Sequence, residues 1–505
     1  MRARAICILA LSALAGPCWA QLPTDDCFNE AGRDPDRAIQ YCTDAIKSRR
    51  LTDYELVHSL NNRGWAYYRK RDYDRAIQDY NQAIQLKPDY AYALNNRGLA
   101  YYSQGQSDRA IQDYDQAIQF KPDHAVAFNN RGLAFESKSE SDRAIKDFDQ
   151  AIKLRPDDAE AFYNRGKAYA ADAQFDRAIK DYNQALRLKP EYAEALQERS
   201  DAYRYRHDED SALRDINHVI ELKPDDANAI SRRASIYFDT REYDRAIRDY
   251  SKVLRLKPED AAAMWFRGGV YYDKGDYDGA IRDFNNVIKL QPEVNVKNVS
   301  EIYERGLAYL CKGDYEGAIR DFNEVANLQL SWGFYHRGLA RFFMGEFKAA
   351  GDDFRRSGEG PYSDIWMYLA QAKLGEKAKE DLEEKAPRIS EELKYWPGAV
   401  VQFYRGSLTP AGVLAAAKQE DLTDRSPCCD DDPGFSHKRG SSHYSEGTAY
   451  FYLGEDALLR GHQQEARALF EKALAMAAKN SEEYHGSVVE LNHMNEATPK
   501  KSTPQ

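Results

Sequence analysis

The sequence repeats itself every 34 residues. Prolines and arginines each recur at that interval through the N-terminal part of the 505-residue chain. The prolines are Pro88, Pro122, Pro156, Pro190, Pro224, Pro258 and Pro292, and the arginines are Arg63, Arg97, Arg131, Arg165, Arg199, Arg233 and Arg267. A chain with such internal copies folds as a stack in which each unit buries its apolar face against its neighbours.

Each copy predicts a pair of antiparallel helices. In residues 91–124 small or apolar side chains recur at helical spacing in two blocks, first Leu94, Gly98 and Tyr101 and then Ala110, Tyr114 and Ala117. Residues 103–107, which include Gly105, break this spacing and predict the turn between the helices. Lys121-Pro122 is expected to end the second helix, because proline disfavours the helical conformation in the residue before it.

These landmarks resemble the tetratricopeptide repeat. In the copy that begins at residue 57 the matching residues are Gly64, Tyr67, Ala76, Tyr80, Ala83 and Pro88. The resemblance implies an all-α fold, a right-handed superhelical solenoid whose concave groove is lined by the first helix of each pair. One departure recurs, because position 7 of the repeat holds arginine where the family usually has leucine. An aspartate at position 23, from Asp79 to Asp283, matches each arginine and predicts an Arg–Asp bridge between the two helices.

The period and its interruptions divide the chain into six parts. Residues 1–20 predict a signal peptide, 21–56 a degenerate capping repeat, and 57–361 a solenoid of about nine repeats. Residues 362–446 are expected to form an irregular helical region with a polar loop, 447–480 a C-terminal repeat, and 481–505 a short helix and a disordered tail. Within residues 362–446 helices are expected over 365–374, 378–386 and 396–404, and from Pro410, with Thr409 as the N-cap.

The N-terminus predicts export without a lipid anchor. Arg2 and Arg4 precede an apolar run that is too short to span a bilayer as an ordinary helix, and cleavage is expected before Gln21. A lipoprotein signal needs a small residue directly before the acceptor cysteine, whereas Pro17 precedes Cys18. We therefore expect a protein exported to the bacterial periplasm or secreted, with no integral membrane span.

Two cysteines of the first repeat are predicted to pair. The repeat register places Cys27 at position 9 and Cys42 at position 24, which lie nearly level across the helical hairpin. An oxidising compartment would permit a disulfide between them, and two unpaired buried thiols are the alternative. The pairing of Cys311, Cys428 and Cys429 stays open.

The sequence from Tyr368 onward carries a second resemblance. Its motifs are Trp-Pro-Gly-Ala-Val-Val-Gln-Phe-Tyr-Arg-Gly, Thr-Ala-Tyr-Phe-Tyr-Leu-Gly and Tyr-His-Gly-Ser-Val-Val-Glu-Leu. They are similar to the C-terminal half of the bacterial envelope lipoprotein NlpI and its exported relatives. That resemblance implies an envelope adaptor, which docks proteases or cell-wall hydrolases onto their substrates.

No catalytic motif stands out. The chain has no Gly-rich phosphate loop, no His-Glu-x-x-His and no Gly-x-Ser-x-Gly. Cys428, Cys429, His437 and His443 lie together in the polar loop, but adjacent cysteines fit a zinc site poorly. We expect no enzyme activity, no cofactor and no metal; the alternative is a metal-binding or hydrolytic protein with its site in residues 362–446.

The predicted binding surface lies on the first helices of the repeats. Asparagine amides both donate and accept hydrogen bonds, so a row of them suits the backbone of an extended peptide, and aromatic rings beside them supply contact area. The predicted residues are Asn61, Asn62, Trp65, Tyr68, Tyr92, Asn95, Asn96, Tyr102, Asn129, Asn130 and Asn164. For each single residue the alternative is that asparagine is simply common at position 6 of this repeat.

Composition and pattern together predict an exported adaptor. The net charge of −11 argues against nucleic acid as the main partner. The expected partners are other proteins or extended peptides of the cell envelope, held in the concave groove. The identity of the partner and the oligomeric state stay open, a homo-oligomer included.

Overall fold

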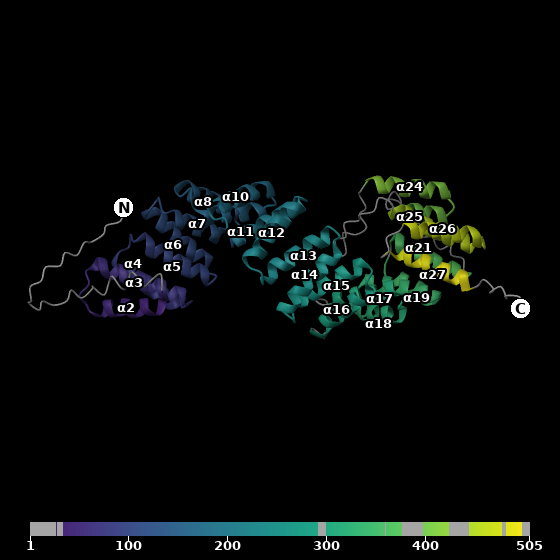
Figure 1. Ribbon diagram of the computed structural model, residues 1–505, viewed down its shortest axis with the longest axis horizontal. Coiled ribbons are helices and arrows are strands. Elements are labelled where there is room, and N and C mark those ends of the chain that lie inside the picture. The colour runs from purple at the N-terminus through teal and green to yellow at the C-terminus, as the bar shows by residue number, and fades with distance from the viewer. Residues whose placement is uncertain are drawn as a thin grey trace, which may run out of the picture. The chain divides into compact units, whose positions relative to one another are not determined.

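The protein is helical throughout the part of the chain that the structure describes (Figure 1). The computed structural model describes residues 27, 34–290, 299–358, 360–375, 397–423, 444–476 and 481–496. No strand occurs among them, which confirms the all-α prediction. The chain folds as two compact units, Met1–Pro224 and Asp225–Gln505, and each is described by itself below.

The helices of the first unit follow the 34-residue period. They are α2 (Pro35–Lys47), α3 (Asp53–Arg69), α4 (Tyr73–Leu86), α5 (Ala91–Ser103), α6 (Ser107–Phe120), α7 (Ala125–Glu136), α8 (Ser141–Leu154), α9 (Ala159–Ala171), α10 (Phe175–Leu188), α11 (Ala193–Tyr205) and α12 (Glu209–Leu222). The predicted boundaries hold, because α5 ends at Ser103, α6 begins at Ser107, and α6 ends just before Lys121-Pro122.

The second unit continues with paired helices and ends in a less regular group. Its paired helices are α13 (Ala227–Asp239), α14 (Tyr243–Leu256), α15 (Ala261–Lys274), α16 (Tyr277–Leu290), α17 (Val299–Lys312), α18 (Tyr315–Asn327), α19 (Ser331–Phe343) and α20 (Phe347–Arg356). The C-terminal group is α21 (Pro361–Lys373), α23 (Gly398–Tyr404), α24 (Pro410–Thr423), α25 (Tyr444–Leu459), α26 (Gln463–Met476) and α27 (Glu482–Glu496).

A glycine at position 8 lets the two helices of a repeat approach each other. A Cβ atom built at Gly98 of α5 would lie only 2.7 Å from Cε1 of Tyr114 in α6. Since real Cβ atoms do not approach that closely, a larger residue would force the ring away, at a cost of about 1–3 kcal/mol. Ala110 is also fully buried at this contact. The small residues of the repeat therefore set the distance between the helices.

The turn inside each repeat uses a left-handed backbone at position 15. Glycine meets this need at Gly105 and Gly275, where φ is 75° and 84°. Five other repeats place an ordinary residue there with φ between 56° and 61°: Arg71, Ser139, Ala173, His207 and Arg241. Because side chains crowd the backbone in this conformation, it costs roughly 1–2 kcal/mol per residue.

The predicted Arg–Asp bridges are confirmed and reach further than expected. In α7, Arg131 Nε donates to Asp147 Oδ2 at 2.7 Å and its Nη2 to Asp147 Oδ1 at 2.7 Å. The remaining guanidinium nitrogen, Nη1, donates to Asp115 Oδ1 at 2.6 Å, in the preceding repeat. Bidentate pairing of this kind is strong and geometrically specific. Position 7 thus ties its own hairpin together and fastens it to the hairpin before.

The C-terminal helices of the second unit share one large apolar core. Trp366 of α21 is fully buried, and its ring packs against the rings of Phe342, Phe354, Phe451 and Tyr452. Those four residues come from α19, α20 and α25, so sequence segments far apart meet at one indole. The expected helices over 365–374, 396–404 and from Pro410 are α21, α23 and α24, whereas the one expected over 378–386 lies outside the described residues.

Cys27 and Cys42 lie together, as the register predicts. Their Cα atoms are 4.7 Å apart, a distance that a disulfide can span, and the disulfide itself stays a prediction. Both side chains are buried. The predicted signal peptide, the cleavage site at Gln21, the acceptor-like Cys18 and the tail beyond residue 496 all lie outside the described residues.

Candidate functional site

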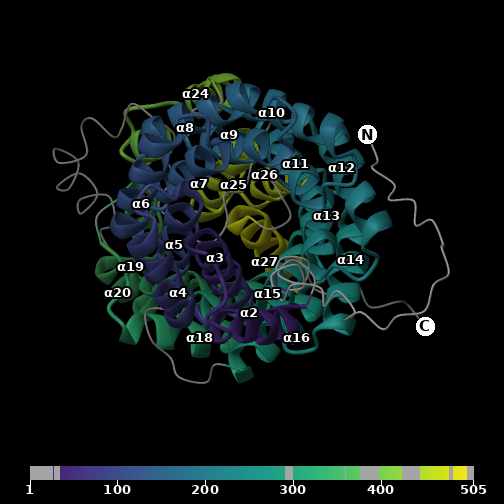
Figure 2. The same cartoon turned by 90° about the vertical axis from the view of Figure 1, so that its left-hand side faces the viewer.

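The first helices of the repeats line the inner side of the first unit. In Figure 2, α3, α5, α7, α9 and α11 lie on the inside of its curve, and α4, α6, α8 and α10 lie on the outside. We call the surface formed by α3, α5, α7, α9 and α11 the inner face. All eleven predicted binding residues belong to α3, α5, α7 and α9.

The predicted asparagines hydrogen-bond to one another across neighbouring repeats. Three equivalent bonds of 3.0 Å run from Asn96 Nδ2 to Asn61 Oδ1, from Asn130 Nδ2 to Asn95 Oδ1 and from Asn164 Nδ2 to Asn129 Oδ1. Each joins position 6 of one repeat to position 5 of the repeat before it. Within the second of these repeats, Asn95 Nδ2 also donates to Asn96 Oδ1 at 3.1 Å. The row is therefore a ladder of amides that connects successive inner helices.

Most of this ladder is closed to a partner. Asn61, Asn95, Asn129, Asn130 and Asn164 are all buried. Buried amides need their hydrogen bonds, and the ladder supplies them from within the protein. Asn62 and Asn96 keep more of their surface exposed. The sequence located the asparagines on the inner face but did not indicate that they bond to each other.

The predicted aromatic residues fall into two groups. Trp65 and Tyr68 stack on each other in α3 with ring centroids 5.2 Å apart, and the Tyr68 hydroxyl lies 3.1 Å from Ser103 Oγ of α5. Tyr102 is half-buried next to Ser103, and burial, then the charge of Glu136, raises the pKa of its phenol. All three residues belong to the inner helices α3 and α5.

Tyr92 belongs to a separate chain of rings at the N-terminal ends of the inner helices. The chain runs Tyr54, His58, Tyr90, Tyr92, His124, with successive ring centroids 4.3, 5.1, 5.8 and 5.1 Å apart. Tyr54 and Tyr92 are its most exposed members, at 69% and 47%. Burial lowers the pKa of His124 to about 4, so this imidazole is neutral at neutral pH. Sequence reasoning missed this cluster, although positions 34 and 2 of the repeat supply most of it.

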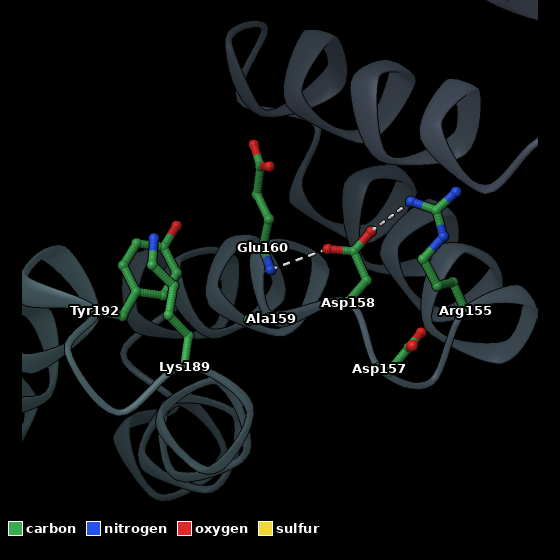
Figure 3. Close-up of a pocket in the computed structure, with 7 residues that line it drawn as sticks. All are labelled: Arg155, Asp157, Asp158, Ala159, Glu160, Lys189 and Tyr192. Atoms are coloured by element: carbon green, nitrogen blue, oxygen red, sulfur yellow. Dashed lines mark hydrogen bonds and ion pairs between the residues drawn. The ribbon is translucent and has the colours of Figure 1, made fainter. Parts of the chain in front are cut away.

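A polar pocket lies where α9 begins (Figure 3). Its volume is about 340 Å³, and its lining includes Arg155, Asp158, Glu160, Lys189 and Tyr192. Asp158 caps α9 by accepting a hydrogen bond from the Glu160 backbone N–H at 3.1 Å, and it pairs with Arg155 at 3.5 Å. The Lys189 ammonium lies 4.0 Å from the centre of the Tyr192 ring. The hydrogen bonds at this pocket are those of the Asp158 cap, so we assign the pocket a role in capping the helix.

Buried charges in the second unit join its C-terminal helices. Lys373 Nζ of α21 lies 3.0 Å from Glu455 Oε2 of α25 and 2.8 Å from Glu490 Oε1 of α27. Glu455 is fully buried, and this burial raises the pKa of its carboxyl to about 7. Lys373 thus pairs with carboxylates from two other helices, and the cluster joins α21, α25 and α27.

The alternative site in residues 362–446 gains no support from the described residues. No group of three or more His, Cys, Asp or Glu side chains is placed to hold a metal ion in the part of the chain that the structure covers. Cys428, Cys429, His437 and His443 lie outside that part. Cys311, in α17, is buried with its Sγ 3.3 Å from the Tyr272 hydroxyl. None of the described helices is both long and apolar enough to cross a membrane.

Comparison with solved structures finds several that resemble part of this chain. Solved structures that resemble this chain include MamA, with 26% identity, a TM-score of 0.30 and coverage of 33% of this chain and 96% of that one. A tetratricopeptide repeat protein from Parabacteroides merdae has 21% identity, a TM-score of 0.39 and coverage of 50% and 99%. YrrB, described as a TPR protein with an unusual peptide-binding site, has 20% identity, a TM-score of 0.32 and coverage of 38% and 97%.

Family models match the repeats directly. A model described as TPR repeat matches residues 64–105, 98–139 and 137–172, and two described as tetratricopeptide repeat match residues 159–192 and 231–294. The matched segments lie in both units and coincide with the paired helices. Residues 64–192 and 231–294 therefore match the tetratricopeptide repeat, and the described residues fold as paired helices of a helical solenoid.

Proposed function

We propose that the protein is an exported adaptor that binds an extended segment of a partner protein along its inner face. The observation that carries the proposal is that α3 and α5, two helices of the inner face, supply the stacked rings of Trp65 and Tyr68, the half-buried Tyr102, and the partly exposed amides of Asn62 and Asn96. Aromatic side chains contribute most of the energy at many protein interfaces. An amide next to them gives direction to a peptide backbone, because it both donates and accepts.

The cellular role within this proposal is the assembly of envelope complexes. The motifs from Tyr368 onward, similar to those of an envelope lipoprotein and its exported relatives, support a docking role for proteases or cell-wall hydrolases. The proximity of Cys27 and Cys42 supports an oxidising compartment, because such a compartment permits a disulfide between them. In this proposal the chain is a scaffold and performs no catalysis itself.

Capture of partners from a bacterial envelope extract tests the proposal. Tyr102→Ala is expected to weaken capture about tenfold or more, because it removes a large contact surface. Asn62→Ala is expected to weaken it a few-fold, in line with one hydrogen bond of about 0.5–1.5 kcal/mol. Phe120→Ala is a matched control, since Phe120 is exposed at the end of the outer helix α6. Equal capture by all three variants would show that the partner binds elsewhere than on the inner face.

A further inference from the structure

The helix α27 of the second unit packs against its neighbours with a polar face. The buried residues among those of α27 that the structure describes are Glu483, Gly486, Ser487, Glu490 and Leu491. Leu491 is the single buried apolar side chain in this set, and Val489 and Met494 add partly buried contacts. Burial of apolar surface is the main term that holds helices together. Because α27 buries so little of it, the polar contacts of this helix carry an unusual share of its attachment.

Glu490 is the residue of this face that pairs with a buried cation. Lys373 Nζ of α21 donates to Glu490 Oε1 at 2.8 Å, and the same ammonium lies 3.0 Å from Glu455 Oε2 of α25. Glu455 is fully buried, and beyond this ion pair its two oxygens have no hydrogen-bond partner in the described part of the chain. One ammonium therefore serves two carboxyl groups, and its single charge neutralises only one of them.

The charge of this cluster depends on the proton of Glu455. With that proton in place, Lys373 and Glu490 form a neutral pair and the buried Glu455 carboxyl is uncharged. Without it, two carboxylates share one ammonium in a buried site, and a buried charge that is not fully compensated is costly. Burial raises the pKa of Glu455 to about 7, with Lys373 acting against this rise and Glu490 adding to it. The costly form therefore appears as pH passes neutrality.

Other ionisable side chains around the cluster pair among themselves. The pairs are Asp456 with Arg460 at 3.0 Å, Lys418 with Glu446 at 3.4 Å, Arg467 with Asn495 at 3.0 Å, the Tyr404 hydroxyl with the Tyr452 carbonyl oxygen at 2.9 Å, and the Tyr452 hydroxyl with Glu483 Oε1 at 3.5 Å. Tyr368 of α21 stacks on Tyr404 with ring centroids 4.6 Å apart. Burial, then the charges of Glu455 and Asp456, raise the pKa of Tyr404 well above its usual value, so this phenol stays neutral.

Two histidines of α27 are further groups of a type that changes charge between pH 5 and 8. His493 Nδ1 lies 3.9 Å from Glu490 Oε2, and its side chain is 59% exposed. The His485 ring lies against the ring of Tyr277 in α16, with centroids 6.2 Å apart. A test of the cluster therefore has to separate Glu455 from these imidazoles.

Departure of α27 would remove the excess charge. It takes Glu490 away, leaves Lys373 to pair with Glu455 alone, and lets water reach the ionised carboxylate. The helix also covers apolar rings. A Cβ built at Gly486 would lie 2.6 Å from Cε2 of Phe451 and 3.3 Å from Cε1 of Phe343, and both of these rings are buried. Release of α27 would therefore uncover them.

We propose that α27 is a releasable strap, which the proton on Glu455 holds in place and which loss of that proton frees from α21 and α25. The strap belongs to the second unit and does not depend on the inner face of the first. The docked state keeps a proton that the released state gives up, because the pKa of Glu455 is about 7 when docked and its ordinary value is 4.5. Docking is therefore strongest at low pH, weakens as pH rises between these values, and changes no further above them.

Hydrogen exchange of the full-length protein at pH 5.5 and pH 8.5 tests the strap, with each rate divided by the intrinsic exchange rate at that pH. Protection of the α27 amides is expected to fall roughly 30-fold from the lower to the higher pH. The amides of α25 and α26 should keep their protection. Glu455→Gln and Glu490→Gln should each abolish the response to pH, the first by removing the proton and the second by leaving Lys373 to Glu455.

Matched variants separate Glu455 from the other titrating groups. His493→Gln removes the imidazole nearest to Glu490, and Glu465→Gln removes a carboxylate of α26 whose side chain is 64% exposed. Both variants should show the parent's response. Circular dichroism at pH 5.5 should show that all four variants are folded, because each residue is replaced by a neutral side chain of similar size.

Three results would overturn the proposal. Equal protection of α27 at the two pH values in the parent would show that the helix is not released. Equal loss of protection in α25, α26 and α27 would show that pH acts on the shared core as a whole. A response that survives Glu455→Gln and disappears in His493→Gln would assign it to the histidine.

Discussion

Tyr114 and Trp366 are both fully buried aromatic residues, one in each unit, but they meet very different neighbours. Tyr114 belongs to a cluster with Tyr101, Ala110 and Ala134, all within two consecutive repeats. Trp366 belongs to a cluster that extends from Val299 to Leu491. The first unit thus divides its core into small, similar portions, whereas the C-terminal helices share a single core. A solenoid region of the first kind is stabilised by nearest neighbours, and damage to it should stay local.

Trp366→Ala should have the largest effect. Removing a fully buried indole costs about 3–5 kcal/mol, and the cavity would border α19, α20, α21 and α25. We expect hydrogen exchange to accelerate over all the C-terminal helices together and to stay unchanged in α3 to α10. Tyr205→Ala, which removes a ring that is 68% exposed, serves as the control. Faster exchange in α21 alone would show that the shared core is not cooperative.

Asp147→Ala should have the second-largest effect on stability, and this effect should be confined to its own and the adjoining repeats. It leaves the Arg131 guanidinium with Asp115 as its only remaining carboxylate, at 2.6 Å. Removing one partner of a buried pair costs about 3 kcal/mol or more. Hydrogen exchange is expected to accelerate in α7, α8 and the adjoining helices α6 and α9, with the second unit unaffected. Loss of protection throughout the chain would mean that the repeats are coupled far more strongly than their small clusters suggest.

Glu455→Gln should give a smaller effect that depends on pH. The carboxyl has an ordinary pKa near 4.5, and burial raises it to about 7 in the folded protein. As pH rises between these values, the unfolded chain releases a proton that the folded chain keeps, so this residue lowers stability by about 1–3 kcal/mol. Urea denaturation at pH 5 and pH 8 should show this loss in the parent and not in the variant.

An exposed carboxylate provides the control for the pH experiment. Glu465, at the start of α26, has a side chain that is 64% exposed. Glu465→Gln should therefore retain the parent's loss of stability between pH 5 and pH 8. An identical pH response in the Glu455 variant and the parent would exclude Glu455 as its source.

The sequence predicted the structure within each repeat and missed side-chain contacts between neighbouring repeats. The spacing of Gly98, Ala110 and Tyr114 was enough to predict the hairpin, and matched positions 7 and 23 were enough to predict the Arg–Asp bridges. The bond from Asn96 to Asn61 spans 35 residues, one more than the period, and depends on how one hairpin is offset from the next. No pattern within a single repeat contains that offset.

The C-terminal core shows a second limit. The helix starts at Gly398 and Pro410 follow local rules and were predicted. Trp366 contacts Phe451, which lies 85 residues further along the chain, and no periodicity relates their helices. Likewise, the Lys373 side chain pairs with Glu455 and Glu490, whose sequence contexts give no sign of burial.

The left-handed turns at position 15 have a consequence for how finely the stability of this protein can be adjusted. Five repeats hold an ordinary residue there, among them Arg71, Ala173 and Arg241, in a conformation that glycine adopts without strain. Each is a separate place where a glycine would release part of that strain, offset by the greater freedom of glycine in the unfolded chain. The turns at Ser139, Ala173, His207 and Arg241 belong to repeats other than those of Trp65, Tyr68 and Tyr102, whereas the Arg71 amide donates to the Tyr68 carbonyl. A graded series of variants would then differ in stability repeat by repeat while presenting the same surface to a partner.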